Sequence, residues 1–274
     1  MPTHQPLLED ATLISREFIA PGFWCLGFHS PNIAQRAGSA QYVAIDVPGD
    51  FAVRLPLGIW TVADETLTLL FREWGTRTAR LAALPLQTEL SLLGPLGNSF
   101  VAPPGTKKAA IVAGGLGIVP FWLLIDEQRR AGIALDVIVG ARSKDLLVGV
   151  PALRELGVEV RTCTDDGSDG NAGTVLQTLA DQDPPDAMFG CGPPAMLRAL
   201  CALAGERNVP CQVSMEETFG CSMGTCWGCV IPVRRGCAQA TGYPRAAGDP
   251  RDFDLARVCA DGTVFDAADV LWQA

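Results

Sequence analysis

The sequence predicts an α+β chain of three domains: an N-terminal β-barrel, a doubly wound parallel α/β domain and a small cysteine-rich C-terminal domain. Residues 1–103 contain short apolar runs separated by turn signals such as Pro48-Gly49-Asp50, which is typical of a barrel or sandwich. Residues 104–217 alternate short apolar runs with helical segments, as a Rossmann-like parallel sheet does. Residues 218–274 are rich in cysteine and glycine and show little helical periodicity, so a bound cofactor is expected to stabilise this small segment.

The individual elements follow from hydrophobic periodicity and from turn signals. In the first domain the clearest strands are Gln41–Val47 and Thr66–Arg72, and Pro103-Pro104-Gly105 is expected to be a linker. In the second domain, short apolar runs predict strands at Ala109–Ala113, Leu135–Gly140, Val158–Thr162, Ala187–Gly190 and Gln212–Met215. Helices are expected between these strands, at Phe121–Ala131, Pro151–Leu156, Thr174–Ala180 and from Pro194 to about Glu206.

Charge and hydropathy exclude some classes of function. The formal net charge of -9 argues against a nucleic-acid partner, which would require basic surface stripes. The uncharged run from Ala109 to Ile125 is short for a membrane span and contains several glycines and Pro120. A buried strand that turns into a helix explains this run better. No secretory signal pattern opens the chain, so we expect a cytoplasmic protein without a membrane span.

The sharpest motif is Cys221-Ser-Met-Gly-Thr-Cys226-Trp-Gly-Cys229. Its C-x4-C-x2-C spacing is that of plant-type [2Fe–2S] proteins, in which a distant fourth cysteine completes the ligand set. Each iron needs two thiolates, and the interspersed glycines allow the backbone to wrap closely around the sulfurs. Structural zinc fits less well because zinc sites usually contain two C-x2-C pairs, and inert buried thiols are the remaining alternative.

The spacing leaves the fourth ligand open between Cys237 and Cys259. Four other cysteines lie in strand-like or helical contexts and are expected to be core residues: Cys25, Cys163, Cys201 and Cys211. The chain has only two histidines, which argues against mechanisms that depend on a histidine cluster.

Two glycine turns in the second domain suggest a dinucleotide site. Gly114, Gly115 and Gly117 follow an apolar strand and precede a helix, so a phosphate group is able to approach the backbone there. Cys191 and Gly192 occupy the same kind of strand-to-helix turn and are expected to line a nicotinamide pocket. A tight turn without a ligand, and an ordinary buried thiol at Cys191, are the simpler alternatives.

A weaker pattern in the first domain suggests a site for a pyrophosphate. Basic side chains and a Gly/Thr turn are able to hold such a group, although a plain β-turn with surface charges fits nearly as well. The candidate residues are Arg54, Leu55, Pro56, Leu57, Gly58, Phe71, Arg72, Glu73, Arg77 and Thr78.

Together these motifs resemble the electron-transfer subunits of type B dihydroorotate dehydrogenase, within the ferredoxin-reductase superfamily. The resemblance covers nearly the whole chain. It is carried by Thr66–Arg72 with Leu93–Asn98, by Gly114–Pro120, Thr164–Gly167 and Cys191–Pro193, and by Ser214–Glu217 with Val258–Phe265. It implies FAD in the barrel, NAD(H) on the parallel sheet, and a [2Fe–2S] cluster held by Cys221, Cys226, Cys229 and Cys259. It also implies a partner subunit that carries FMN and oxidises dihydroorotate.

The sequence departs from the family pattern at the flavin site. Where the family has Arg-Pro-x-Ser, Leu55 takes the place of the arginine and Gly58 that of the serine. Arg54 lies one residue early, which in a strand points to the opposite face. The family's Gly-Thr is here Arg77-Thr78. One hypothesis is that Arg77 or Arg54 supplies the missing positive charge.

The resemblance implies that NADH reduces the flavin and that the cluster then carries single electrons to a partner, with no acid–base residue required. Two other classes stay open, namely a stand-alone reductase and a carrier subunit whose flavin site has decayed. The partner is also open, because related subunits serve hydrogenases, sulfide reductases and transhydrogenases. Arg142, Ser143 and Lys144 are candidates to meet a 2′-phosphate, or they form a solvated loop.

Overall fold

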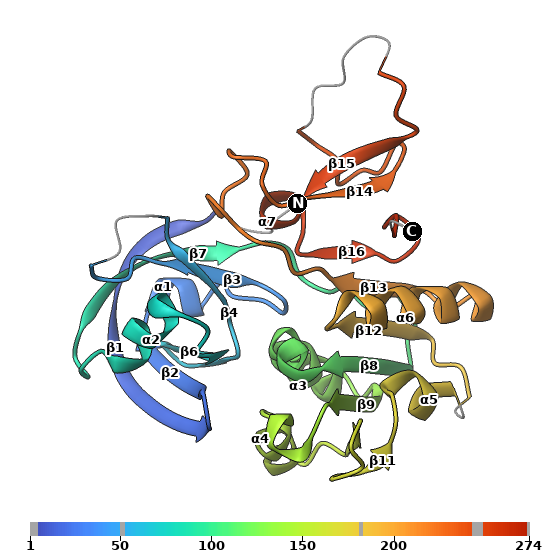
Figure 1. Ribbon diagram of the computed structural model, residues 1–274, viewed down its shortest axis with the longest axis horizontal. Coiled ribbons are helices and arrows are strands. Elements are labelled where there is room, and N and C mark those ends of the chain that lie inside the picture. The colour runs from blue at the N-terminus through green and yellow to red at the C-terminus, as the bar shows by residue number, and fades with distance from the viewer. Residues whose placement is uncertain (1–4, 50–52, 181–182, 243–248, 273–274) are drawn as a thin grey trace.

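The N-terminal domain is a curled antiparallel sheet of seven strands in the order β4-β3-β7-β1-β2-β6-β5 (Figure 1). The computed structural model describes residues 5–49, 53–180, 183–242 and 249–272. The strands of this first sheet are β1 (Leu7–Ala20), β2 (Phe23–His29), β3 (Tyr42–Ile45), β4 (Leu55–Gly58), β5 (Thr61–Ala63), β6 (Thr66–Arg72) and β7 (Glu89–Leu96). The expected β-rich domain is confirmed, with β6 at the bounds that the sequence predicts and β3 two residues shorter at its C-terminal end.

Two helices complete this domain, α1 (Pro31–Ala34) and α2 (Thr76–Ala83). The sequence predicts a Gly/Thr turn at residues 75–78, whereas in the structure Gly75 precedes the helix and α2 begins at Thr76. The helix is short and amphipathic, because Leu81 and Ala82 pack into the core while Arg80 reaches the carbonyl of Gly49. Tertiary packing, which a short window of sequence does not show, therefore decides the conformation of this segment.

The second domain is a doubly wound parallel sheet, as the sequence predicts. Its strands are β8 (Lys108–Gly114), β9 (Ala134–Ala141), β10 (Val160–Thr164), β11 (Asn171–Ala172), β12 (Ala187–Cys191) and β13 (Cys211–Ser214). They are connected by η1 (Gly115–Phe121), α3 (Trp122–Arg130), η2 (Lys144–Leu146), α4 (Val150–Glu155), α5 (Val175–Ala180) and α6 (Pro194–Arg207). The strand order is β11-β10-β9-β8-β12-β13, and the predicted elements are confirmed within two residues at each end.

The central strand β8 is apolar from Ala109 to Ala113 because this stretch is covered on both faces. Ala110 and Val112 belong to the core formed with α5 and α6, whereas Ala109 and Ile111 belong to the core under α3 and α4. The uncharged run that continues beyond β8 divides into a strand, the 3-10 helix η1 and the short helix α3. No helix among the described residues is both long and apolar enough to cross a membrane.

The C-terminal segment contains β14 (Val230–Arg234) paired with β15 (Phe253–Arg257), then α7 (Val258–Asp261) and β16 (Val264–Asp266). Strand β16 adds an antiparallel edge to the second domain's sheet, where Val213 of β13 lies opposite Phe265. The sequence does not predict this pairing. The domain limits at residues 103 and 217 stay a prediction, and the C-terminal segment returns to the α/β sheet (Figure 1).

The N-terminal domain is joined to the C-terminal segment by hydrogen bonds from Asn98. The Asn98 side chain accepts from the Val264 N–H at 2.8 Å and donates to the Val264 carbonyl at 2.9 Å. The Asn98 backbone N–H donates to the Gly262 carbonyl at 2.8 Å. The Asn98 amide therefore makes the pair of hydrogen bonds with the Val264 backbone that a neighbouring strand would make, and it joins the first domain to the C-terminal segment.

We predict that Asn98→Ala lowers the free energy of unfolding by about 2 kcal/mol, because each partly buried hydrogen bond contributes about 1 kcal/mol. Urea unfolding followed by tryptophan fluorescence measures this change. Asn98→Asp keeps the acceptor for the Val264 N–H and is expected to lose about half as much. Equal stability of all three proteins would show that Asn98 does not join the two domains.

Candidate functional site

The two glycine turns of the second domain lie against each other at the carboxyl ends of β8 and β12. A Cβ atom at Gly117 would lie 2.2 Å from the carbonyl oxygen of Cys191, and one at Gly114 would lie 2.6 Å from Cδ of Pro193. Glycine is therefore required at both positions because the turns contact each other. Gly115 differs from them, since it has a φ of +56° and faces open space. Of these three predicted residues, Gly115 has the free approach that a phosphate group needs.

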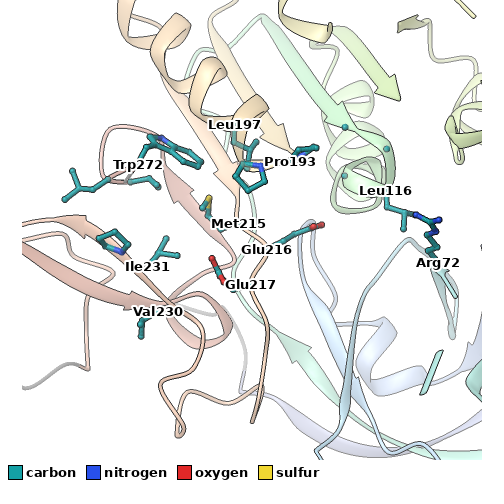
Figure 2. A pocket seen from close by; sticks show the side chains of 18 of the residues that line it. Arg72, Leu116, Pro193, Leu197, Met215, Glu216, Glu217, Val230, Ile231 and Trp272 are labelled. Carbon is teal, nitrogen blue, oxygen red and sulfur yellow. The ribbon is translucent and has the colours of Figure 1, made fainter. Parts of the chain in front are cut away.

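A cavity of about 750 Å³ lies where the three domains meet. Its wall comes from both glycine turns, from Arg72 and Phe23 of the first domain and from the C-terminal segment. Figure 2 shows Glu216 pointing toward the side of Arg72 and Leu116, and Glu217 on the side of Ile231. Because Val230 and Ile231 directly follow Cys229, this central cavity reaches from the glycine turns to the end of the cysteine loop.

A second cavity, of about 330 Å³, opens at the carboxyl ends of β9 and β10 and shares Gly114, Gly115 and Pro193 with the central cavity. Arg142 and Asp165 both line it, so the pocket presents one cation and one anion. Ligands of open α/β sheets bind at this edge, outside the carboxyl ends of the strands.

A third cavity, of about 370 Å³, lies between the first domain and η1 and is lined by residues from β4, β6 and η1. Pro56, Leu57 and Gly58 form one wall, while Phe71 and Arg72 belong to the neighbouring strand in the wall. Its size is within the range of about 300–1,000 Å³ that small-molecule sites have. Arg72, Leu116 and Glu216 line both this cavity and the central one, so the two adjoin.

Gly58 has a structural explanation in this third cavity. A Cβ atom at Gly58 would lie 3.1 Å from Cγ1 of Val119, so the valine occupies the space of a larger side chain. The serine expected at this position from the family pattern would require Val119 to move.

The other predicted residues of the first domain have partners within the protein. The Arg54 guanidinium donates to the Ser91 carbonyl at 2.7 Å, and Arg77 donates to the Val53 carbonyl. Glu73 accepts from the Trp24 indole at 3.2 Å, and the Thr78 hydroxyl accepts from the Trp74 N–H at 2.6 Å. Leu55 begins β4 and is half-buried.

Arg72 is the arginine that lines both cavities next to the first domain. Its guanidinium carbon lies 5.7 Å from the centre of the Phe23 ring and 5.1 Å from that of the Trp74 ring. Trp74 is 77% exposed and also lines the third cavity, so it forms an aromatic rim beside the positive charge.

The side chains of Cys191 and Glu216 contact each other beside the central cavity. The Cys191 sulfur lies 3.9 Å from Oε1 of Glu216. Burial, together with the charge of Glu216, raises the pKa of the Cys191 thiol well above its usual range. Glu216 reaches water inside the cleft but is surrounded by protein on most sides, and this desolvation raises the pKa of its carboxyl group. The Cys191 thiol therefore favours its neutral form and lacks the character of a nucleophilic thiolate.

The four predicted cluster cysteines lie in two pairs. The Cys221 and Cys226 thiols are close enough to hydrogen-bond, and the Cys226 N–H donates to the Cys221 sulfur at 3.3 Å. The Cys229 and Cys259 thiols form the second pair, and the Cys259 N–H lies 3.5 Å from the Cys229 sulfur. Within the described parts of the chain, no three cysteine, histidine or carboxylate side chains gather around a single point.

The backbone of the loop favours sulfur ligands that carry negative charge. Partial burial opposes ionisation of Cys221, but the N–H groups of Met223, Thr225 and Cys226 outweigh it and lower the pKa of this thiol to about 6. Burial and the neighbouring Cys229 raise the pKa of the Cys259 thiol to about 12. The Cys259 thiol therefore ionises near neutral pH only beside a positive charge, as metal ions provide.

Other features of the loop also fit a bound inorganic group. A Cβ atom at Gly220 would lie 3.1 Å from the Cys226 sulfur, so this glycine keeps the space beside the thiol free. Ser222 is buried with a φ of +61°, and its hydroxyl has no hydrogen-bond partner among the described residues. A buried hydroxyl without a partner costs free energy that a bound acceptor would recover.

Cys237 is placed differently from Cys259. Its sulfur lies 3.5 Å from Oδ2 of Asp269, and it follows β14 within the core of the C-terminal segment. Cys163 and Cys211 are buried in the sheet core as expected, whereas Cys25 and Cys201 are half-buried. The structure thus pairs Cys259, and not Cys237, with a cysteine of the loop.

Several residues of the site are not among those singled out from the sequence. Glu216, Phe23 and Trp272 line the central cavity, and Arg257 donates to the Gly224 carbonyl at 3.0 Å within the cysteine loop. Their roles depend on contacts between distant segments, which periodicity and spacing do not reveal. Only Glu216 has a sequence signal, because it lies in the segment Ser214–Glu217 that carries the family resemblance.

The fold and these sites define a flavin-reductase type of electron-transfer protein. A scan against protein-family models found no match. The dihydroorotate dehydrogenase B (NAD(+)) electron transfer subunit of Caldanaerobacter subterraneus subsp. tengcongensis is 32% identical over 233 residues, 85% of this chain and 86% of its own length. The subunit of the same name from Desulforamulus reducens is 29% identical over 271 residues, 96% of this chain and 98% of its own length. The chain belongs to this family of electron transfer subunits.

Solved structures agree on the fold. The NADH-dependent reduced ferredoxin-NADP oxidoreductase, solved in work on flavin-based electron bifurcation, aligns with a TM-score of 0.79 at 23% identity. The alignment covers 96% of this chain and 90% of the other. Phthalate dioxygenase reductase aligns with a TM-score of 0.62 at 15% identity, over 92% of this chain and 94% of its own. The three-domain, ferredoxin-reductase-like fold predicted from the sequence is therefore confirmed.

We predict that Glu216→Gln stabilises the protein at pH 8 and not at acid pH. A carboxyl group whose pKa is raised by folding contributes stability below its unfolded pKa of about 4.3, and this contribution is lost as the pH rises through the folded value. Glutamine resembles the protonated form, so the variant escapes that loss. Urea unfolding between pH 4 and pH 8 measures the difference, which is expected to grow with pH. Glu217→Gln controls for the loss of one negative charge, and a difference independent of pH would contradict the prediction.

Proposed function

We propose that this chain transfers electrons from a reduced nicotinamide dinucleotide, through FAD, to a [2Fe–2S] cluster and on to a partner subunit. The observation that carries the proposal is a cavity shared by all three domains whose wall includes Val230 and Ile231, the two residues that follow Cys229 of the cysteine loop. When bound, the flavin accepts a hydride and releases electrons singly, and the cluster accepts them one at a time. The chain's own residues bind and orient these groups and exclude water.

The proposed dinucleotide site is the cavity at the carboxyl ends of β9 and β10 together with the glycine turns. Gly115 gives a phosphate access to the backbone, and Gly192 keeps the second turn close to the first. Glu216 is placed to border the nicotinamide end, because it lines both the central and the flavin-side cavity, and Cys191 lies behind it, fully buried, with its sulfur 3.9 Å from the carboxylate. Arg142 and Asp165 face the same pocket, so the choice between NADH and NADPH depends on the balance of these two charges.

The proposed flavin site is the third cavity. Its wall of Pro56, Leu57, Gly58 and Phe71 suits a flat aromatic ring, and Glu216 closes the side toward the second domain. Leu55 and Gly58 remove the polar side chains of the family pattern. Arg72 is able to supply the positive charge instead, since Arg54 is occupied by Ser91.

We predict that Arg72→Leu weakens FAD binding about tenfold or more, which is the effect of losing one charge-assisted hydrogen bond. Titration of deflavinated protein with FAD, followed by flavin fluorescence, measures the affinity. Arg54→Leu is the matched control and is expected to bind FAD like the wild type. If Arg54→Leu/Arg77→Leu loses affinity while Arg72→Leu keeps it, the charge comes from the other two arginines, as the sequence suggests.

The proposed cluster ligands are Cys221, Cys226, Cys229 and Cys259. Two thiols for each of two irons is the arrangement that a [2Fe–2S] cluster requires, and the N–H groups around Cys221 supply hydrogen bonds to sulfur. Met223, which is 55% exposed, and the exposed Cys226 lie in this loop. This exposed loop is the surface we propose for docking the partner subunit, which in this family would carry FMN.

We predict that anaerobically prepared Cys259→Ser loses most of its iron and acid-labile sulfide, whereas Cys237→Ser keeps both. The physical reason is that Cys259 completes the second thiol pair, while Cys237 contacts Asp269. Iron and sulfide analysis with the visible spectrum measures the effect. If only Cys237→Ser loses iron, Cys237 and not Cys259 is the fourth ligand. Zinc in the wild-type protein would exclude an iron–sulfur cluster.

The proposed function is tested as a whole by adding NADH to the anaerobic wild-type protein. Bleaching of both flavin and cluster absorption is expected, followed by reoxidation when the partner subunit and its electron acceptor are added. Bleaching without any effect of the partner would favour a stand-alone reductase. Cluster absorption without flavin would favour a carrier subunit whose flavin site has decayed.

A further inference from the structure

Tyr42 lies in the strand next to the proposed flavin cavity. It is 4% exposed, and in the register of β3 it stands opposite Gly58 of β4. Gly58 is part of the cavity wall. The backbone of Tyr42 is therefore fixed to the flavin side of the molecule.

The Tyr42 hydroxyl lies at the cysteine-bearing segments. Its oxygen is 2.8 Å from the carbonyl oxygen of Ser222 and 2.9 Å from that of Cys259. Its ring packs against Phe219 with the two ring centres 5.2 Å apart. Ser222 follows the first cysteine of the loop, and Cys259 is the proposed fourth ligand. One side chain thus contacts both segments that have to converge on the cluster.

We propose that Tyr42 is a positioning residue, which fixes both cysteine-bearing segments to each other and to the strand pair that lines the flavin cavity. This inference rests on the proposed function for its purpose, but the contact itself can be tested without any cofactor. The phenol has one proton for two converging carbonyl oxygens, so the two segments are held together by sharing it. Ser222 and Cys259 are 1% and 2% exposed, so loss of the donor would leave a buried carbonyl oxygen unsatisfied.

The decisive variant is Tyr42→Phe, which removes the hydroxyl and keeps the ring that packs on Phe219. The matched control is Thr263→Val, because the Thr263 hydroxyl donates to the Ala40 carbonyl at 2.9 Å across the same domain boundary. That bond is also buried but touches neither Ser222 nor Cys259. The two variants therefore differ in which carbonyls lose their donor.

The first measurement is amide hydrogen exchange of the metal-free protein. We expect exchange at residues 221–226 and 258–261 to become about tenfold faster in Tyr42→Phe, which is the effect of losing one buried donor. Thr263→Val is expected to exchange like the wild type in these two segments. Equal exchange in Tyr42→Phe and the wild type overturns the inference, whether or not the protein binds a cluster.

The second measurement uses the loaded protein. Tyr42→Phe is expected to keep its flavin and its rate of flavin reduction by NADH. It is also expected to lose iron faster on dialysis and to pass electrons from flavin to cluster several-fold more slowly. If the wild-type protein contains no iron, the proposed function is wrong, but the hydrogen-exchange result still tests the contact made by Tyr42. Unchanged iron loss and unchanged electron transfer in Tyr42→Phe, with a wild type that contains the cluster, overturn the positioning role.

Discussion

The antiparallel pairing of β13 with β16 is the interaction on which the arrangement of the site depends. Ser214, the last residue of β13, lies opposite Val264, the first residue of β16. The chain continues from Ser214 into the three-cysteine loop, and it reaches Val264 five residues after Cys259. Two segments more than 30 residues apart in the sequence therefore leave one pair of strands at the same end. The pairing of β14 with β15 then brings Cys259 beside Cys229, because Val230 lies opposite Arg257 and the Val258 N–H donates to the Cys229 carbonyl at 2.9 Å.

The same pairing explains why the central cavity has walls from all three domains. Met215, Glu216 and Glu217 extend β13 past the edge of the sheet and run along the cavity before the cysteine loop begins. On the other side, Asn98 joins Gly262 and Val264 to the first domain. The cavity is thus bounded by segments held by backbone pairing, which costs little further ordering when ligands bind.

Much of this architecture is predictable from local sequence. The alternating strands and helices of the second domain follow from apolar runs and glycine turns. Strand β8 is predicted correctly because burial on both faces makes it a continuous apolar run. Helix α2 is not predictable in this way, since Leu81 and Ala82 acquire their role only by packing into the first domain. The antiparallel pairing of β13 with β16 is equally unpredictable from sequence, because a strand of three residues is too short to show a periodic pattern of apolar residues.

The residues of the candidate site also fall into those that local sequence predicts and those that depend on contacts between distant segments. The cysteine spacing predicts the loop ligands because one short segment carries three of the candidate cysteines. The choice between Cys237 and Cys259 needs either a family resemblance or the contact between Cys259 and Cys229. Glu216 and Tyr42 act through partners more than 20 residues away, so no local pattern marks them. At the flavin site, Leu55 and Gly58 look like losses in sequence, while the structure shows Val119 filling the space beside Gly58.

The backbone conformation of the cysteine loop depends on contacts with residues outside the loop. Ser222 and Trp227 both adopt positive φ, near +60°, which side chains other than glycine rarely do. Strain of this kind, of order 1–3 kcal/mol for each residue, persists only where the surroundings over-determine the conformation. Here Arg257 supplies part of that determination, because it donates to the Gly224 carbonyl, pairs with Asp261 and lies 4.7 Å from the centre of the Trp227 ring. The loop is therefore held with its N–H groups toward sulfur by contacts from outside it.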